Sequence, residues 1–165
     1  AYYFDAVAGA AEEGITAGVT GTSFAPDRGC TRAQIVTFLW RANGSPKASD
    51  RENPFTDVKR GSYYYEAVLW ALEEGITDGV TGTSFAPDAV CTRAQAAVLL
   101  WRAQGSPKAE KDHGFRDVAD GAYYADAVAW AAANGVTEGT TAVTFAPDVR
   151  CTRAQIVTFL YRALG

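Results

Sequence analysis

Histidine, methionine and cysteine are scarce in this 165-residue sequence, and each scarcity excludes a class of function. Methionine is absent even at position 1, which fits a chain excised from a longer protein. The only histidine, His113, lies in a polar segment far from any matching nucleophile and carboxylate, so no catalytic set can be assembled around it. We therefore expect a protein that is not an enzyme and that needs no cofactor.

Long apolar runs and an excess of positive charge are also missing. No stretch of eighteen apolar residues occurs, so we expect no membrane insertion. The formal net charge is −4 and the pI is about 5.0, which argues against a nucleic-acid partner. No secretory signal is recognisable, and we expect any such signal to lie elsewhere in a larger exported protein.

The three cysteines do not fit a disulfide framework. Cys30, Cys91 and Cys151 are odd in number, and none has a partner in its own part of the chain. Cys-x-x-Cys and Cys/His spacings typical of metal sites are absent, so no metal site is predicted from the motif. Packing as small buried residues is one interpretation. Convergence of the three thiols on a common axis, as a metal site or one disulfide, is the other.

One pentapeptide, Cys-Thr-Arg-Ala-Gln, occurs three times, and the whole sequence can be organised around it. The copies are offset by 61 residues (30 to 91) and 60 residues (91 to 151), so one structural unit is used three times. Thr-x-x-Gln ahead of an apolar run is a helix capping box. We therefore expect a helix to begin directly after Thr31, Thr92 and Thr152.

Each unit is predicted to be a helix, a long loop and a second helix. The first helices are expected at 2–13, 63–74 and 123–134, each ended by glycine. Loops rich in glycine, threonine and proline follow. The predicted division is repeat one at 1–44, a linker at 45–54, repeat two at 55–105, a linker at 106–114 and repeat three at 115–165. Repeat one lacks the Phe-x-Asp-Val opening of the other two, so we interpret it as truncated.

The second helix of each repeat is apolar around most of its circumference. In the first repeat only Gln34, Thr37 and Arg41 form a polar stripe. A helix buried on nearly all sides must contact several elements. We expect the first helix of the same repeat to cover one side. The three second helices would then form a central bundle around a pseudo-threefold axis, in an all-α fold.

The arginine of the pentapeptide is not explained by helix capping. Arg32, Arg93 and Arg153 lie opposite the polar stripe, where a cation opposes the helix dipole and needs a partner if it is buried. One interpretation is a structural arginine bound to a carboxylate or to carbonyls of a neighbouring repeat. The other is an anion-binding arginine beside the free N–H groups of a helix N-terminus. The sequence leaves both open.

Four motifs together resemble the S-layer homology domain over essentially the whole chain: Phe-x-Asp-Val, Gly-Ile-Thr-x-Gly, Phe-x-Pro-Asp and Thr-Arg-Ala-Gln. This sequence has glutamine where the family usually has glutamate, and Ala25, Ala86 and Ala146 where the family often has lysine or arginine. The resemblance implies an all-α pseudo-trimer with grooves between its repeats. It also implies noncovalent anchoring of exported proteins at the extracellular surface of a bacterial cell wall.

The resemblance further implies a ligand, a secondary cell wall polysaccharide that often carries pyruvate ketals. The motif's arginine contributes to anion recognition in that family. Carried over, that role falls on Arg32, Arg93 and Arg153. The ligand-binding candidates also include the neighbouring Gln34, Gln95 and Gln155. Tyrosines at 63–65 and 123–124 are candidates to stack on sugars, with core packing as the alternative for the aromatic residues generally. The groove candidates among the aromatic residues are Tyr64, Tyr124, Trp70 and Trp130. The alternative function is a structural module that joins protein to protein in a surface layer without a glycan ligand.

Overall fold

The computed structural model describes residues 1–49 and 51–165, and this part of the chain is all-α, as the sequence predicts. It holds six helices and no strands, only isolated β-bridges between loops. The helices are α1 (Phe4–Glu12), α2 (Arg32–Ala42), α3 (Tyr65–Glu73), α4 (Arg93–Ala103), α5 (Ala125–Ala133) and α6 (Arg153–Leu164). The linker predicted at 45–54 contains residue 50, which lies outside the described residues. No helix of the described part is long and apolar enough to cross a bilayer.

The three predicted capping boxes are confirmed at the starts of α2, α4 and α6. At α4, the Thr92 hydroxyl accepts the Gln95 N–H at 3.1 Å, and the Gln95 side-chain oxygen accepts the Thr92 N–H at 3.0 Å. The other two helices repeat this arrangement. Two N–H groups that a helix start leaves unpaired are thus satisfied locally, and this fixes where each helix begins.

The helices α1, α3 and α5 each begin two residues later than the sequence predicts. A tyrosine occupies each N-cap position, and its side chain caps nothing: Tyr3, Tyr64 and Tyr124. The residue before each of them belongs to a turn rather than to the helix. Because no side chain caps these helices, the first two residues of each predicted helix are not helical. The tyrosines at these positions therefore lie in a β-turn-like segment before the helix.

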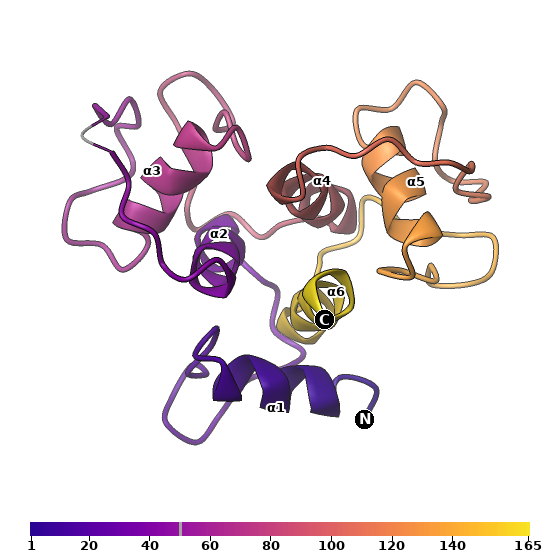
Figure 1. Ribbon diagram of the computed structural model, residues 1–165, viewed down its shortest axis with the longest axis horizontal. Helices are drawn as coiled ribbons and strands as arrows, with labels where there is room; N and C mark the ends of the chain where they lie inside the picture. The colour runs from indigo at the N-terminus through magenta and orange to yellow at the C-terminus, as the bar shows by residue number, and fades with distance from the viewer. Residues whose placement is uncertain (50) are drawn as a thin grey trace.

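Each first helix packs on the second helix of a different repeat, so the expectation that it covers its own repeat's second helix is wrong. Helix α3 packs on α2, α5 on α4, and α1 on α6, which pairs the two ends of the chain. Figure 1 shows the resulting three lobes, with α2, α4 and α6 on the inside and α1, α3 and α5 outside. The long loop within each repeat carries the chain from one lobe to another. Helix α4 also contacts α2 and α6.

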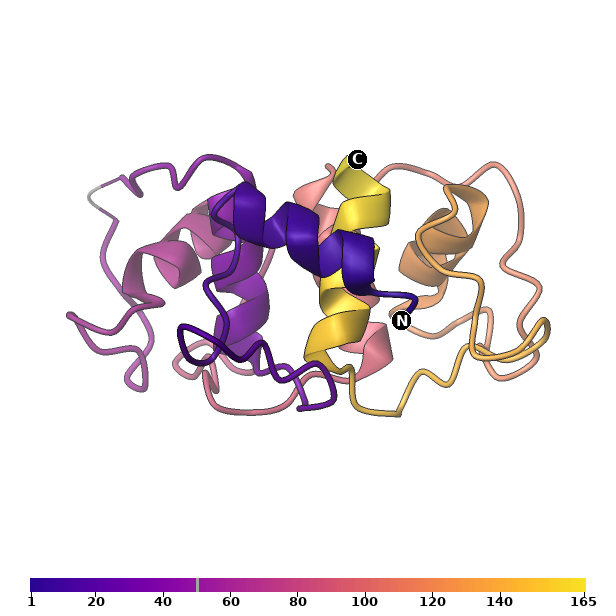
Figure 2. The same ribbon diagram turned by 90° about the horizontal axis from the view of Figure 1, so that it is seen from below.

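The three cysteines join the repeats through their main chains. The N–H of Cys30 donates to the carbonyl of Cys151 at 2.8 Å, that of Cys91 to Cys30 at 2.9 Å, and that of Cys151 to Cys91 at 2.8 Å. The three bonds form a closed ring just before the starts of α2, α4 and α6. These three helices run in similar directions in Figure 2. The thiols are free and fully buried, as the packing interpretation predicts. Among the described residues no cluster of three or more His, Cys, Asp or Glu side chains is placed to hold a metal ion.

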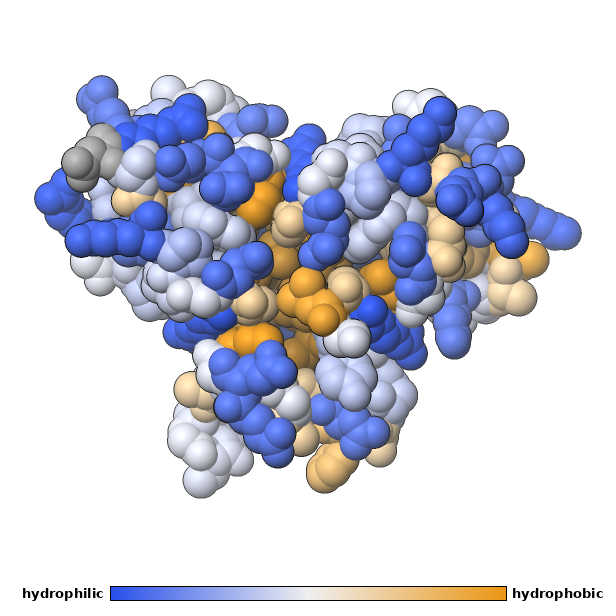
Figure 3. All heavy atoms as spheres, viewed as in Figure 1, coloured by the Kyte–Doolittle hydropathy of each residue, from blue (hydrophilic) through white to orange (hydrophobic). Residues whose placement is uncertain are grey.

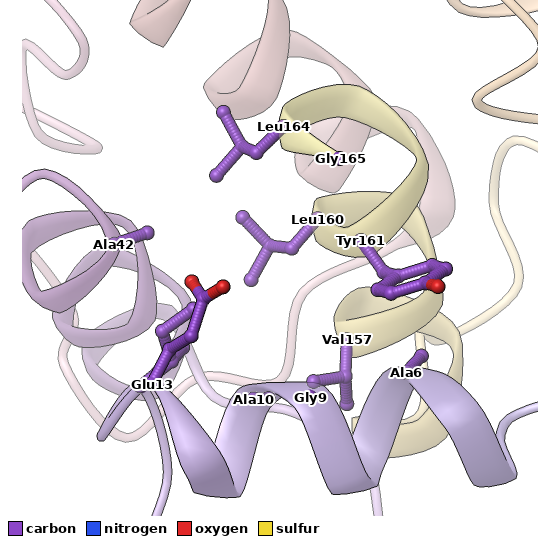
Figure 4. A pocket seen from close by; sticks show the side chains of 11 residues that line it. Ala6, Gly9, Ala10, Glu13, Ala42, Val157, Leu160, Tyr161, Leu164 and Gly165 are labelled. Carbon is purple, nitrogen blue, oxygen red and sulfur yellow. The ribbon is translucent and has the colours of Figure 1, made fainter.

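Apolar residues gather where the lobes meet, and hydrophilic residues cover the outer parts of the face in Figure 3. Trp70 and Trp130 belong to this core, with 7% and 5% of their surface exposed. The equivalent position on α1 is Gly9, and here the core is incompletely filled. A cavity of about 300 Å³ lies between α1, α6 and the end of α2 (Figure 4). Its walls are mainly apolar, with Val157, Leu160 and Tyr161 on the α6 side.

Candidate binding groove

The three motif arginines are buried and cross to the next repeat. Arg32, Arg93 and Arg153 are exposed by only 7%, 4% and 3%. Their Nε–H groups donate to the main-chain carbonyls of three loop phenylalanines: Arg32 to Phe85 at 2.8 Å, Arg93 to Phe145 at 2.8 Å and Arg153 to Phe24 at 2.9 Å. The structural interpretation, in which each arginine bonds a carbonyl of a neighbouring repeat, therefore applies to the Nε–H of each guanidinium.

The same phenylalanine rings also lie against the arginines. The guanidinium carbon of Arg153 is 4.9 Å from the Phe24 ring centroid and 5.4 Å from that of Phe38. Arg93 is sandwiched similarly by Phe145 and Phe159, at 4.8 and 5.4 Å. Aromatic faces attract cations by about 0.5–2 kcal/mol each, more when water is excluded. The rings thus offset part of the cost of burial, which by itself lowers the pKa of each arginine.

The helix N-termini beside the arginines are not free. The N–H groups of Arg153 and Ala154 donate to the carbonyls of Arg28 and Pro26 at 2.9 and 3.0 Å. The starts of α2 and α4 are satisfied in the same way by loop carbonyls of the following repeat. Together with the capping boxes, these bonds occupy the main-chain donors that an anion at a helix N-terminus would use. Any anion recognition here has to come from side chains.

The remaining guanidinium nitrogens provide such donors. Arg153 uses only Nε for its hydrogen bond to Phe24, which leaves both Nη groups without a hydrogen-bond partner among residues 1–49 and 51–165. No buried side-chain nitrogen or oxygen in the described part of the chain lacks a hydrogen-bond partner. The Nη groups must therefore keep some contact with solvent, although the residue as a whole is almost fully buried. Arg153 is one of the residues that line a groove.

This groove, named here the Arg153 groove, has a volume of about 390 Å³ and is built from all three repeats. Repeat three contributes Arg153 and repeat two contributes Tyr63. Repeat one contributes the loop 16–19 and one face of α2, with Gln34, Thr37, Phe38 and Arg41. The structure therefore brings together two predicted ligand-binding residues, Arg153 and Gln34. By repeat position, the pairs equivalent to Arg153 and Gln34 are Arg32 with Gln95 and Arg93 with Gln155.

The loop wall of the Arg153 groove is fixed by its own hydrogen bonds. The Thr16 hydroxyl accepts the Gly18 N–H at 3.1 Å, and the same bond recurs at Thr77 and Thr137. Gly18 has a φ of +82°, and a Cβ there would lie 2.5 Å from the Ser23 carbonyl oxygen. This requirement explains the second glycine of the Gly-Ile-Thr-x-Gly motif. Arg41 is tied to the same loop, since its Nη1 donates to the Ile15 carbonyl at 3.3 Å.

In repeats two and three an aspartate holds the loop that carries the key phenylalanine. Asp57 accepts the N–H groups of Phe85 and Ala86 at 2.9 and 2.8 Å and the Ser84 hydroxyl at 2.7 Å. Burial acts to raise the pKa of Asp57, but these hydrogen bonds outweigh it and lower the pKa below its ordinary value. Asp117 accepts the corresponding N–H groups in repeat three, with the same effect on its pKa. The Phe-x-Asp-Val opening thus positions the carbonyls that bind Arg32 and Arg93.

The aromatic candidates divide between core and groove. Trp70 and Trp130 are buried in the core, so the groove assignment of these two residues is wrong and the packing alternative applies. Tyr64 packs against the core and Tyr124 against a neighbouring cluster, each partly buried. The tyrosine that lines the Arg153 groove is Tyr63, which is 59% exposed and packs edge-on against Tyr64.

Sequence reasoning also missed Arg41, although the signal for it was present. Gln34, Thr37 and Arg41 form the polar stripe of an otherwise apolar helix, and in the structure all three line the groove. The Gln34 side-chain oxygen is used in the capping box, which leaves its amide group as a donor beside the groove. The stripe therefore marks the groove-facing side of α2.

Sequence comparisons place this architecture among known proteins. The profile of the S-layer homology domain matches residues 1–36, 54–97 and 114–157. An endoglucanase from Bacillus sp. (strain KSM-635) is 34% identical over 110 residues, which cover 67% of this chain and 12% of that protein. A surface-layer 125 kDa protein from Lysinibacillus sphaericus is 32% identical over 60% of this chain and 8% of its own length. A cell surface protein from Thermoanaerobacter kivui is 33% identical over 81% of this chain and 18% of its own. The chain thus spans less than a fifth of each of these relatives.

Proposed function

Because the chain belongs to the S-layer homology domain family, we propose that it anchors a larger protein to a bacterial cell wall by binding an anionic wall polysaccharide in its inter-repeat grooves. Family membership makes the chain a non-catalytic cell-surface module of three tandem repeats, located at the extracellular face of the wall. The enzymes among its relatives match only over small shares of their own lengths, 8% to 14%.

The observation that carries the proposal is the Arg153 groove. Arg153 is 3% exposed and lines the groove, yet its two Nη groups have no hydrogen-bond partner among the described residues. An arginine can grip a carboxylate with two parallel hydrogen bonds, and such bonds strengthen where surrounding rings exclude water. Arg41 adds a second cation to the groove lining, and Tyr63 adds an exposed aromatic face on which a sugar ring can stack. The groove thus offers matched partners for an acidic sugar.

We further propose that the acid is a carboxylate held on the sugar ring, such as a pyruvate ketal, and that the lobes are related by a pseudo-threefold axis. The closed ring of cysteine hydrogen bonds and the recurring arginine–phenylalanine contacts support the symmetric arrangement. Such symmetry would provide three related grooves. Each would use an arginine from one repeat and a polar helix stripe from the next.

A protein–protein assembly module without a glycan ligand is the competing function. The three arginines donate hydrogen bonds to carbonyls of other repeats, so part of each side chain has a structural role, as the assembly function requires. A sedimentation assay with purified cell walls separates the two functions. We expect the chain to sediment with walls that retain their polysaccharide and to stay in solution with walls stripped of it. Equal sedimentation with both preparations would support the assembly module.

A further inference from the structure

The three repeats differ in charge at one position of the Gly-Ile-Thr-x-Gly loop, the residue between threonine and glycine. That residue is Ala17 in the first repeat, Asp78 in the second and Glu138 in the third. Ala17 lines the Arg153 groove directly. All three side chains are exposed, so each is available to a ligand bound at the equivalent place in its own repeat.

At the second position the carboxylate already faces an arginine. Asp78 Oδ2 lies 3.9 Å from the Nη1 of Arg102, and Arg102 is the counterpart of the groove-lining Arg41. An anionic ligand in that groove competes with Asp78 for Arg102 and is repelled by the same carboxylate. In the Arg153 groove no lining residue is acidic, while both Arg41 and Arg153 are present. The net charge of the lining is therefore most favourable to an anion where the loop residue is alanine.

We propose that residues 17, 78 and 138 set the affinity of each groove for a carboxylate-bearing sugar, and that the Arg153 groove is the primary site. This inference rests on the proposed polysaccharide-binding function. Asp78 and Glu138 hold the other two grooves at lower affinity for acidic sugars. The chain would then contain one strong and two weak sites despite its repeated fold.

The test is calorimetric titration of the intact chain with the acidic polysaccharide released from cell walls. Ala17→Asp introduces the carboxylate of the second groove, and Ala17→Asn introduces a side chain of the same size without charge. We expect Ala17→Asp to bind the polysaccharide about three- to tenfold more weakly than Ala17→Asn, in line with a single exposed charge interaction. The difference should shrink at high salt because exposed charges are screened. Asp78→Asn should act in the opposite direction and strengthen the weak phase of the titration.

The outcomes separate the inference from the function on which it rests. If Ala17→Asp and Ala17→Asn bind equally, and Asp78→Asn leaves the weak phase unchanged, the charge inference is overturned while polysaccharide binding stands. If the unaltered chain fails to bind the polysaccharide at all, the proposed function itself is overturned. Melting curves of the variants confirm that each comparison is made between folded chains.

Discussion

Arg153 donates its Nε–H to the carbonyl of Phe24, 2.9 Å away, although 129 positions separate the two residues in the chain. The bond closes the molecule, because it joins the last repeat to the first. It also ties the guanidinium to the Phe24 loop through Nε alone, so neither Nη group is used by a protein partner in the described part of the chain. Arg153 thus joins two repeats through its Nε–H, while its Nη groups are available to a ligand.

This dual role leads to a prediction about Arg41 and Arg153. Arg153→Ala should lower both polysaccharide affinity and stability, each by about 1–3 kcal/mol, because the ligand and the partly buried Phe24 carbonyl each lose a charged donor. Arg41→Ala should lower affinity with little change in stability, because Arg41 is partly exposed and its bond to Ile15 is long at 3.3 Å. The check is a binding isotherm beside a denaturation curve for each variant. Equal losses of stability in the two variants would be incompatible with this division of roles.

Mutations of the other two motif arginines are expected to rank below Arg153→Ala in binding. Arg93→Ala should weaken binding measurably and Arg32→Ala less. Arg32 contacts one phenylalanine ring, Phe85, whereas Arg93 contacts two. Competition between variants for a limiting amount of polysaccharide measures the ranking. The reverse order, with Arg32→Ala the most damaging, would contradict it.

The cavity at Gly9 predicts a stabilising substitution. A Cβ at Gly9 would lie 3.6 Å from the Tyr161 ring, an ordinary contact, and about 300 Å³ of space lies beyond. Gly9→Ala should raise the free energy of unfolding by about 0.5–1 kcal/mol through helix propensity alone. Gly9→Trp should raise it further by restoring the side chain found at Trp70 and Trp130. The matched control is Trp70→Gly, which should cost at least about 3–5 kcal/mol, the usual cost of truncating a buried tryptophan to alanine. Denaturant unfolding of the three variants gives the values, and a loss of stability in Gly9→Trp would rule out the cavity.

The buried cysteines predict slow and weakly pH-dependent thiol labelling. Burial raises the pKa of Cys91 and of Cys151 to about 12, so almost no thiolate is present even at pH 9. We expect alkylation of the folded chain to be limited by unfolding and to be rapid in denaturant. Mass spectrometry over a time course measures it. Complete modification within minutes under native conditions, rising with pH as for a free thiol, would contradict this expectation.

Asp57 and Asp117 predict a loss of stability in acid. Their pKa values are lowered in the folded chain, so each stabilises the fold fully above about pH 4, the ordinary carboxyl pKa. That stabilisation is lost as the pH falls through the lowered folded values. Asp57→Asn and Asp117→Asn should therefore flatten the dependence of unfolding free energy on pH below 4. Denaturant unfolding between pH 2 and 7 is the measurement, and an unchanged slope in both variants would exclude this source of acid sensitivity.

The starts of the second helices could be predicted because their causes are local. A capping box needs only residues three positions apart, and the burial of the arginines follows from their place in the apolar arc of the helix. The packing of α3 on α2 instead of α4 could not be predicted from such local sequence patterns. Every first helix presents a similar apolar face, and the path of the long loop decides which second helix receives it.

The groove tyrosine illustrates a second limit. The sequence offered the tyrosines at 63–65 as candidates and Tyr64 was named among them, but residues 63 and 64 lie in a turn, where the spacing of a helix does not apply. Tyr63 is consequently the residue that faces the groove. Arg41 was recognised in the polar stripe, but its place in the groove depends on the loop 16–19, which approaches it only in the folded chain.

The central claim, recognition of an acidic wall polysaccharide in the Arg153 groove, is tested most directly by one calorimetric comparison. The chain is titrated with the acidic polysaccharide and with the same polymer after chemical reduction of its carboxyl groups. We predict binding of the acidic form, roughly tenfold weaker in Arg41→Ala (about 1.4 kcal/mol), and loss of most of the affinity for the reduced form. Equal binding of the acidic and the reduced polymer, with no effect of Arg41→Ala, would contradict the account.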